Sequence, residues 1–246
     1  MSSASKIFNE NSLAMMGIKG VRQRGTWMRG SASTSMNGTT GLYSGTVLTT
    51  DSTPVNTARG RDIFGAYYDA VTSAVIGNNA GHSFNPNGDF LARETPSATK
   101  FSIKFGRVTN MRCFIGLSAS TTLGSGIDAD TLTVNSFGIQ FSPTTRGDTT
   151  FQLVAFNGSQ SLVSTSLVPA DNSLLEAILF WTNTSEVCCD MKLFSTTGAF
   201  VSETAKITTN LITSTTALVP NFGCETRTAA TLSMKCYGVE TENWSI

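Results

Sequence analysis

The chain has 246 residues, enough for one large all-β domain or two smaller ones, and 40% of them are apolar, enough to fill a core. Its 17 basic and 17 acidic residues cancel, which excludes a general basic field for nucleic acid. Only 14% of residues are charged, and 29 serines and 36 threonines stand in their place. Serine favours turns and threonine favours the pleated surface of a sheet. No apolar stretch has the length of a membrane span or the form of a secretion signal.

The first residues differ from the rest of the chain. Residues 1–30 carry five basic side chains against Glu10 alone. This excess suits either a solvated arm or contact with phosphate or an acidic neighbouring subunit. Short apolar patches without a periodic partner lie in the same region and are costly to leave in water. We therefore predict an N-terminal arm over residues 1–34 that mediates assembly. The residues expected to do so are Ile7, Phe8, Leu13, Met15, Met16, Arg22 and Arg24.

Regular strand patterns follow the arm, separated by segments rich in Gly, Pro, Asn and Asp, the residues that make turns. The sequence predicts strands at 43–48, 63–68, 101–105, 111–117, 137–141, 151–156, 161–163, 174–181, 187–194 and 232–239. Such short, punctuated strands without a helical period predict an all-β domain over residues 35–246. An antiparallel β-sandwich with very little helix is the expected fold.

Two stretches give more detail. MRCFIGL (111–117) is apolar on both faces, which predicts an interior strand whose Arg112 marks the end where solvent begins. LLEAILFW and EVCCDMKLF are separated by a four-residue polar turn, which predicts a hairpin, and Lys192 indicates that one of its faces is wet. The five cysteines are odd in number and lack a C-x-x-C pair, so we expect reduced thiols and no zinc site.

The sequence carries no strong pattern of catalytic residues. The nearest carboxylate pairs are Asp128 with Asp130, in a Gly-rich loop, and Glu240 with Glu242 near the C-terminal end. Neither has the mid-strand setting of a glycoside hydrolase pair. Calcium binding by the first pair is an alternative, although a solvated loop is favoured. The single histidine, His82, is expected in a surface loop, and no G-x-S-x-G occurs. The sequence therefore predicts no enzyme, no metal and no cofactor.

Sugar binding on a sandwich usually needs an exposed aromatic ring beside polar side chains. The aromatic candidates are Trp27, Trp181, Trp244, Tyr67 and Tyr68, of which Trp181 is expected in the core. The loops 78–90 and 120–131 have suitable polar character, although they are equally suited to be ordinary connections. No ligand follows from these features.

The order of strands resembles lectin-like β-sandwich modules of virion proteins from tailed phages and other viruses. The matching stretches are RCFIGL (112–117), FGIQF (137–141), FQLV (151–154), LLEAIL (174–179), MKLF (191–194) and the LVP at 218–220. The resemblance covers roughly residues 60–240 and is one of strands, not of catalytic motifs. It implies a jelly-roll or concanavalin-like sandwich of the kind used in tail fibres, spikes or capsid decoration.

These expectations combine into one functional hypothesis. The chain would be a structural virion protein that self-assembles through its arm, with a trimer as our guess, and that contacts other virion proteins. Its sandwich would face outward, with a host surface glycan as a further partner; membrane and nucleic acid are not expected partners. The alternative is a carbohydrate-binding lectin module that is not part of a particle.

Overall fold

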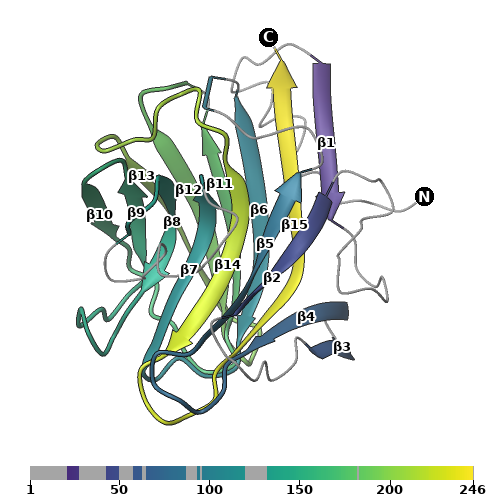
Figure 1. Cartoon of the computed structure of the whole chain (residues 1–246), viewed down its shortest axis with the longest axis vertical. Helices are drawn as coiled ribbons and strands as arrows, with labels where there is room; N and C mark the ends of the chain where they lie inside the picture. The colour runs from purple at the N-terminus through teal and green to yellow at the C-terminus, as the bar shows by residue number, and fades with distance from the viewer. Residues whose placement is uncertain are drawn as a thin grey trace.

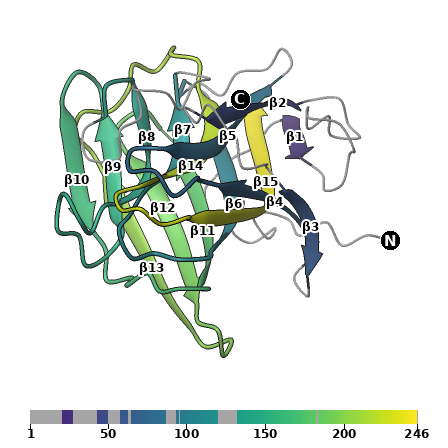
Figure 2. The ribbon, with the colours of Figure 1, turned by 60° about the horizontal axis from the view of Figure 1, so that its bottom comes forward.

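The structure is a computed structural model that describes residues 21–27, 43–49, 58–62, 65–86, 93–94, 96–119, 132–181 and 183–245. The predicted fold class is confirmed: the described residues form two antiparallel sheets packed as a sandwich, and none of them is helical. Figures 1 and 2 show the two layers from two directions. Within the described part of the chain, no helix is long and apolar enough to cross a membrane.

The first sheet has eight strands in the order β13-β12-β11-β6-β15-β4-β3, with β1 paired to β15 beside this path. Its strands are β1 (Val21–Trp27), β3 (Ala58–Asp62), β4 (Gly65–Val71), β6 (Ser97–Phe105), β11 (Leu174–Trp181), β12 (Val187–Phe194), β13 (Phe200–Ile207) and β15 (Ser233–Ser245). The second sheet has seven strands in the order β10-β9-β8-β7-β14-β5-β2. These are β2 (Tyr43–Thr49), β5 (Asn79–Pro86), β7 (Met111–Ser118), β8 (Ser136–Phe141), β9 (Gln152–Phe156), β10 (Gln160–Ser164) and β14 (Val219–Thr226).

The main core lies between the two sheets and is filled by side chains that alternate along each strand. Phe137 of β8 meets Trp181 of β11 edge-on, with ring centroids 5.4 Å apart. Phe105 of β6 lies 5.5 Å from Phe151, just before β9. Because each pair joins one sheet to the other, these rings fix the spacing of the sandwich.

Strand β7 is the interior strand that its sequence predicts, since all eight of its residues are buried. Arg112 corrects one detail, because it is only 5% exposed and does not reach solvent. Its guanidinium lies 3.2 Å from the carboxylate of Glu225 on the neighbouring strand β14. The charge of Arg112 is therefore balanced within the protein, and the strand has no wet end at that residue.

The predicted hairpin at 174–194 is confirmed, because β11 and β12 pair in register from Leu174 opposite Phe194. Lys192 is exposed, as expected of a wet face. Adjacent Cys188 and Cys189 lie on opposite faces of β12, the first half-buried and the second buried. All five cysteines are unpaired, and burial raises the pKa of Cys113 and Cys236 to about 12. Those two thiols therefore stay protonated at neutral pH.

Five strands lie outside the predicted set, and β1 and β3 are two of them. β13 was not predicted, β14 extends well beyond the LVP stretch of the resemblance, and β5 replaces most of the expected loop 78–90. The expectation that His82 sits in a surface loop is wrong, because His82 lies in β5 between Phe222 of β14 and Val47 of β2. The small and polar residues of NAGHSFNP hide this strand, since they lack the apolar alternation that sequence patterns detect.

Candidate functional site

An open groove of about 480 Å³ lies on the solvent face of the eight-stranded sheet, over β6, β11, β12 and β13. Residues on one face of a strand alternate with core residues, so the pairing register places the groove residues in rows across the sheet. One row is Lys100, Ile178, Asp190 and Thr204. The neighbouring row is Ser102, Glu176, Lys192 and Ser202.

Polar contacts hold the groove residues in place. The ammonium of Lys100 lies 3.6 Å from a carboxylate oxygen of Glu176. The hydroxyl of Thr204 donates a 2.6 Å hydrogen bond to Oδ1 of Asp190. A carboxylate offers about four acceptor positions, so Asp190 can accept further hydrogen bonds from a ligand in the groove. Two ammonium groups and two carboxylates alternate here, which leaves the two rows without a net charge.

Aromatic rings flank the groove in the next row, where Leu174, Phe194 and Phe200 lie opposite one another. The rings of Phe194 and Phe200 are 5.4 Å apart, and Phe200 is 56% exposed. Nζ of Lys192 lies 5.7 Å from the centroid of the Phe200 ring, which fixes this side chain between the aromatic row and the groove. The face therefore combines an accessible ring with carboxylate, ammonium and hydroxyl groups.

This combination suits a neutral ligand with many hydroxyl groups. Carboxylates accept hydrogen bonds from hydroxyls, ammonium groups donate to them, and an aromatic ring covers the apolar face of a ring-shaped ligand. Glu203 adds a third carboxylate to the lining of the groove, so a strongly anionic ligand would be repelled. The groove volume of about 480 Å³ lies within the range of small-molecule sites.

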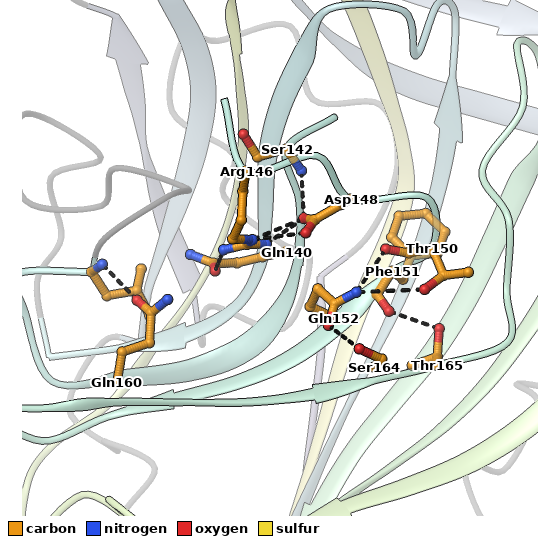
Figure 3. Close-up of polar contacts among 11 residues, drawn as sticks. Gln140, Ser142, Arg146, Asp148, Thr150, Phe151, Gln152, Gln160, Ser164 and Thr165 are labelled. Atoms are coloured by element: carbon orange, nitrogen blue, oxygen red, sulfur yellow. Dashed lines mark hydrogen bonds and ion pairs between the residues drawn. The ribbon is translucent and has the colours of Figure 1, made fainter. Parts of the chain in front are cut away.

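A second polar cluster lies on the opposite side of the molecule, on the outer face of the seven-stranded sheet (Figure 3). Nε of Arg146 donates to Oδ1 of Asp148 at 2.8 Å, and its Nη1 donates to Oε1 of Gln140 at 2.9 Å. The backbone N–H of Ser142 donates to Oδ2 of Asp148 at 2.9 Å. The Asp148 side chain is only 7% exposed and Gln140 is fully buried. This cluster therefore ties the β8–β9 connection to the sheet and offers little surface to a ligand.

The neighbouring part of the same face is closed as well. In Figure 3, Oγ of Ser164 donates to Oε1 of Gln152 at 2.8 Å, and the backbone N–H of Leu132 donates to Oε1 of Gln160 at 2.9 Å. Phe114, Leu132 and Val154 form a second apolar cluster here, all of them buried. The side-chain amides of Gln152 and Gln160 are thus engaged in hydrogen bonds within the protein, and the apolar cluster is buried. The groove on the other sheet is therefore the more accessible site.

The predicted assembly residues fall into two groups. Ile7, Phe8, Leu13, Met15 and Met16 lie outside the described residues. Arg22 and Arg24 lie in β1, where they pair in register with Trp244 and Glu242 of β15. Figure 1 shows β1 beside β15 along the edge of the sheet. Their proposed role in assembly stays a prediction.

The other candidates that the structure describes do not line the groove. Asp128 and Asp130 fall outside the described residues, as do the side chains of Trp27, Trp244 and Tyr68. Glu240 lies on β15 opposite Lys100. Trp181 is in the core, as expected, and is 1% exposed. Tyr67 packs edge-on against Tyr237, with Nζ of Lys235 4.1 Å from the Tyr67 ring.

Metal ligands do not gather in the part of the chain that the structure describes. No group of three or more His, Cys, Asp or Glu side chains there could hold a metal ion. Asp190 and Glu176, the nearest such carboxylates in the groove, each have a polar side-chain partner already.

The groove residues were missed by sequence reasoning because β13 was missed. FVSETAKI does carry a signal: Val201, Ala205 and Ile207 alternate with Ser202, Thr204 and Lys206. Glu203 interrupts the apolar set, and this hides the alternation. Its carboxylate accepts 2.6 Å hydrogen bonds from the backbone N–H and the hydroxyl of Ser166, at the edge between the sheets.

Comparison with known proteins identifies solved structures with a similar fold. No family model matches the chain, and no curated protein matches its sequence. A protein of unknown function from Shewanella oneidensis MR-1 superposes with a TM-score of 0.56 at 12% identity, covering 98% of this chain and 96% of that one. Peanut lectin, solved with a 9mer peptide, gives a TM-score of 0.56 at 7% identity, with 93% and 99% covered. The CBM2 module of the evolved Dit of Lactobacillus casei BL23 phage J-1 gives 0.50 at 9% identity, with 93% and 99% covered.

These similarities concern the fold, since the identities are low. The chain has the lectin-like β-sandwich that its strand order predicted, and it spans nearly the full length of each of these structures. Shared architecture does not transfer a binding site from one protein to another, so the groove is assessed on its own residues.

Proposed function

We propose that the protein is a carbohydrate-binding module that holds a neutral glycan in the groove over β6, β11, β12 and β13, without cleaving it. The observation that carries this proposal is the exposed Phe200 ring beside the row of Lys192 and Ser202, with the row of Asp190 and Thr204 next to that. One sugar ring stacks on Phe200 with its hydroxyl groups bonded to Lys192, and the next sugar of the glycan reaches Asp190. Similarity of the fold to lectins and to a phage CBM2 module supports the same class of function.

A panel of immobilised neutral and acidic glycans tests this proposal. We expect binding to neutral glycans, and we expect Phe200→Ala and Asp190→Ala each to weaken it at least tenfold, since each removes a main contact. Lys206→Ala is the matched control, because Lys206 lies on the same face of β13 but outside the groove. Unchanged binding in both groove variants, or equal loss in the control, would contradict the site. Cleavage of a bound glycan would contradict the absence of catalysis.

We further propose that this module belongs to a virion and assembles through its first residues into a homo-oligomer that contacts other virion proteins. The basic excess of residues 1–30 and the similarity to a phage module support this placement. Removal of residues 1–20 keeps β1, which pairs with β15, in the chain.

Removal of residues 1–20 tests the assembly proposal. We expect the shortened chain to keep its β-sheet circular dichroism and its glycan binding while losing oligomerisation or particle attachment. Light scattering measures the mass of both chains at equal concentration. If the shortened chain has the same mass as the full chain, the first residues do not mediate assembly.

A further inference from the structure

Exposed apolar side chains gather at one end of the sandwich. In the described part of the chain, six large apolar side chains are exposed by 42–62%. Phe200 lies in the aromatic row beside the groove, and Leu162 of β10 belongs to neither of the two pairs formed by the remaining residues. The other four form two pairs: Val75 with Ile76, and Val168 with Val201. Each pair offers a small apolar surface to a partner.

The first pair forms an apolar protrusion on the turn between β4 and β5. Val75 and Ile76 are 59% and 61% exposed. The turn is held firmly: Gly77 adopts a φ of 87°, and its N–H donates to the carbonyl of Thr226 at 2.9 Å. The N–H of Asn78 also donates to the carbonyl of Val75 at 3.0 Å. A rigid turn presents these two side chains without an ordering cost on binding.

The second pair borders an apolar cavity of about 210 Å³. Val168 comes from the β10–β11 connection, while Leu193 and Val201 come from β12 and β13. Its volume exceeds the roughly 150 Å³ of a cavity that holds a benzene molecule, so it has room for one or two aliphatic side chains. Val201 points to the opposite face of β13 from Ser202 and Thr204, while Phe194 and Phe200 also line the cavity, so the cavity adjoins the aromatic row beside the groove.

Protrusion and cavity lie at the same end of the sandwich, the lower end in Figure 1 and the end turned toward the reader in Figure 2. β12 ends there because it runs antiparallel to β11, which starts there. β4 ends there because it runs antiparallel to β15, which also starts there. Between β12 and β4 the sheet order is β12-β11-β6-β15-β4. Four strand spacings separate the two features by roughly 19 Å.

We propose that two copies of the chain pack end to end about a two-fold axis, with the protrusion of each copy seated in the cavity of the other. The two-fold axis lies in the contact plane, midway between the protrusion and the cavity. Rotation about it places the protrusion of each copy on the cavity of the other. Such an interface is self-complementary and closes at two copies. Two apolar contacts form at once, and the chain itself supplies an occupant of matching size and chemistry. Val75, Ile76 and Val201 do not line the groove.

Sedimentation of the full chain at increasing concentration, up to about 1 mM, tests the proposal over the Kd range of weak contacts. We expect Ile76→Asp and Val201→Lys each to halve the mass of the assembly, because each variant spoils both contacts of its own dimer. Leu162→Asp is the matched control and should keep the wild-type mass, since Leu162 belongs to neither feature. Far-UV circular dichroism, which should be unchanged in all three variants, confirms that they are folded.

Mixing the two variants gives the sharper result. A mixed pair has one intact contact, and at its second contact the introduced carboxylate faces the introduced ammonium, so the dimer mass should return. Three results would overturn the proposal: a wild-type mass no greater than that of the variants, a mixture that does not regain the dimer mass, or a mass that keeps rising beyond twice that of the variants.

Discussion

Replacing Gly138 with alanine is expected to lower the free energy of unfolding by about 3 kcal/mol, as an overpacked core position does. Gly138 of β8 lies directly opposite Gly116 of β7. A Cβ atom at Gly138 would lie 2.4 Å from the carbonyl oxygen of Ile115 and 2.7 Å from Cα of Gly116. Both are backbone atoms of a paired strand, so the clash is relieved only if two strands in the middle of the sheet separate.

Urea unfolding followed by circular dichroism measures this loss, read from the midpoint at unchanged m value. Gly238→Ala is the matched control, because no atom lies within 4 Å of a Cβ built there and its φ is not positive. We expect the control to stay within about 0.5 kcal/mol of the wild type. Equal stability of Gly138→Ala and Gly238→Ala would show that β7 and β8 are farther apart than this pairing requires.

Arg146→Met is expected to cost about 3 kcal/mol of stability, since it leaves a largely buried carboxylate without its main partner. Nε of Arg146 donates to both carboxylate oxygens of Asp148, at 2.8 and 3.1 Å. The Asp148 side chain is 7% exposed and that of Arg146 is 18% exposed. After the substitution, the N–H of Ser142 would remain as the nearest donor to Asp148.

The double variant Arg146→Met/Asp148→Leu separates the buried charge from the lost contact. We expect it to recover most of the stability, because apolar replacement of a buried ion pair is often neutral. Lys206→Met is the control, since Lys206 is 66% exposed and its 3.4 Å pair with Glu186 is a surface pair. Such pairs contribute about 0–1 kcal/mol. A double variant as unstable as Arg146→Met alone would show that packing, not charge, sets the cost.

The strands that sequence reasoning identified are those with a strong apolar pattern. β7, β8 and β11 lie over the core, and their runs of Phe, Ile and Leu are dictated by that position. β5 and β13 were missed because neither has a run of large apolar residues: β5 reads NAGHSFNP, and Glu203 interrupts the apolar positions of β13. β13 is also the edge strand of its sheet, and such a strand buries little, so its sequence is less constrained.

The groove could not be predicted from the sequence because it depends on register across four strands. Lys100, Ile178, Asp190 and Thr204 are far apart in the chain and meet only through pairing of β6, β11, β12 and β13. A shift of one residue in any pairing would turn that strand's side chains toward the core. Lys192 was the one visible sign, since it marked this face as wet.

Mapping a bound glycan by NMR tests the central claim most directly. A neutral glycan that binds in the panel is titrated into isotope-labelled protein while backbone chemical shifts are followed. The largest changes are expected at Asp190, Lys192 and Thr204 and at Phe200 of the adjoining aromatic row, saturating at the Kd measured in the panel. Changes confined to the seven-stranded sheet, or an absence of saturable changes for any glycan that binds in the panel, would contradict a binding site in the groove.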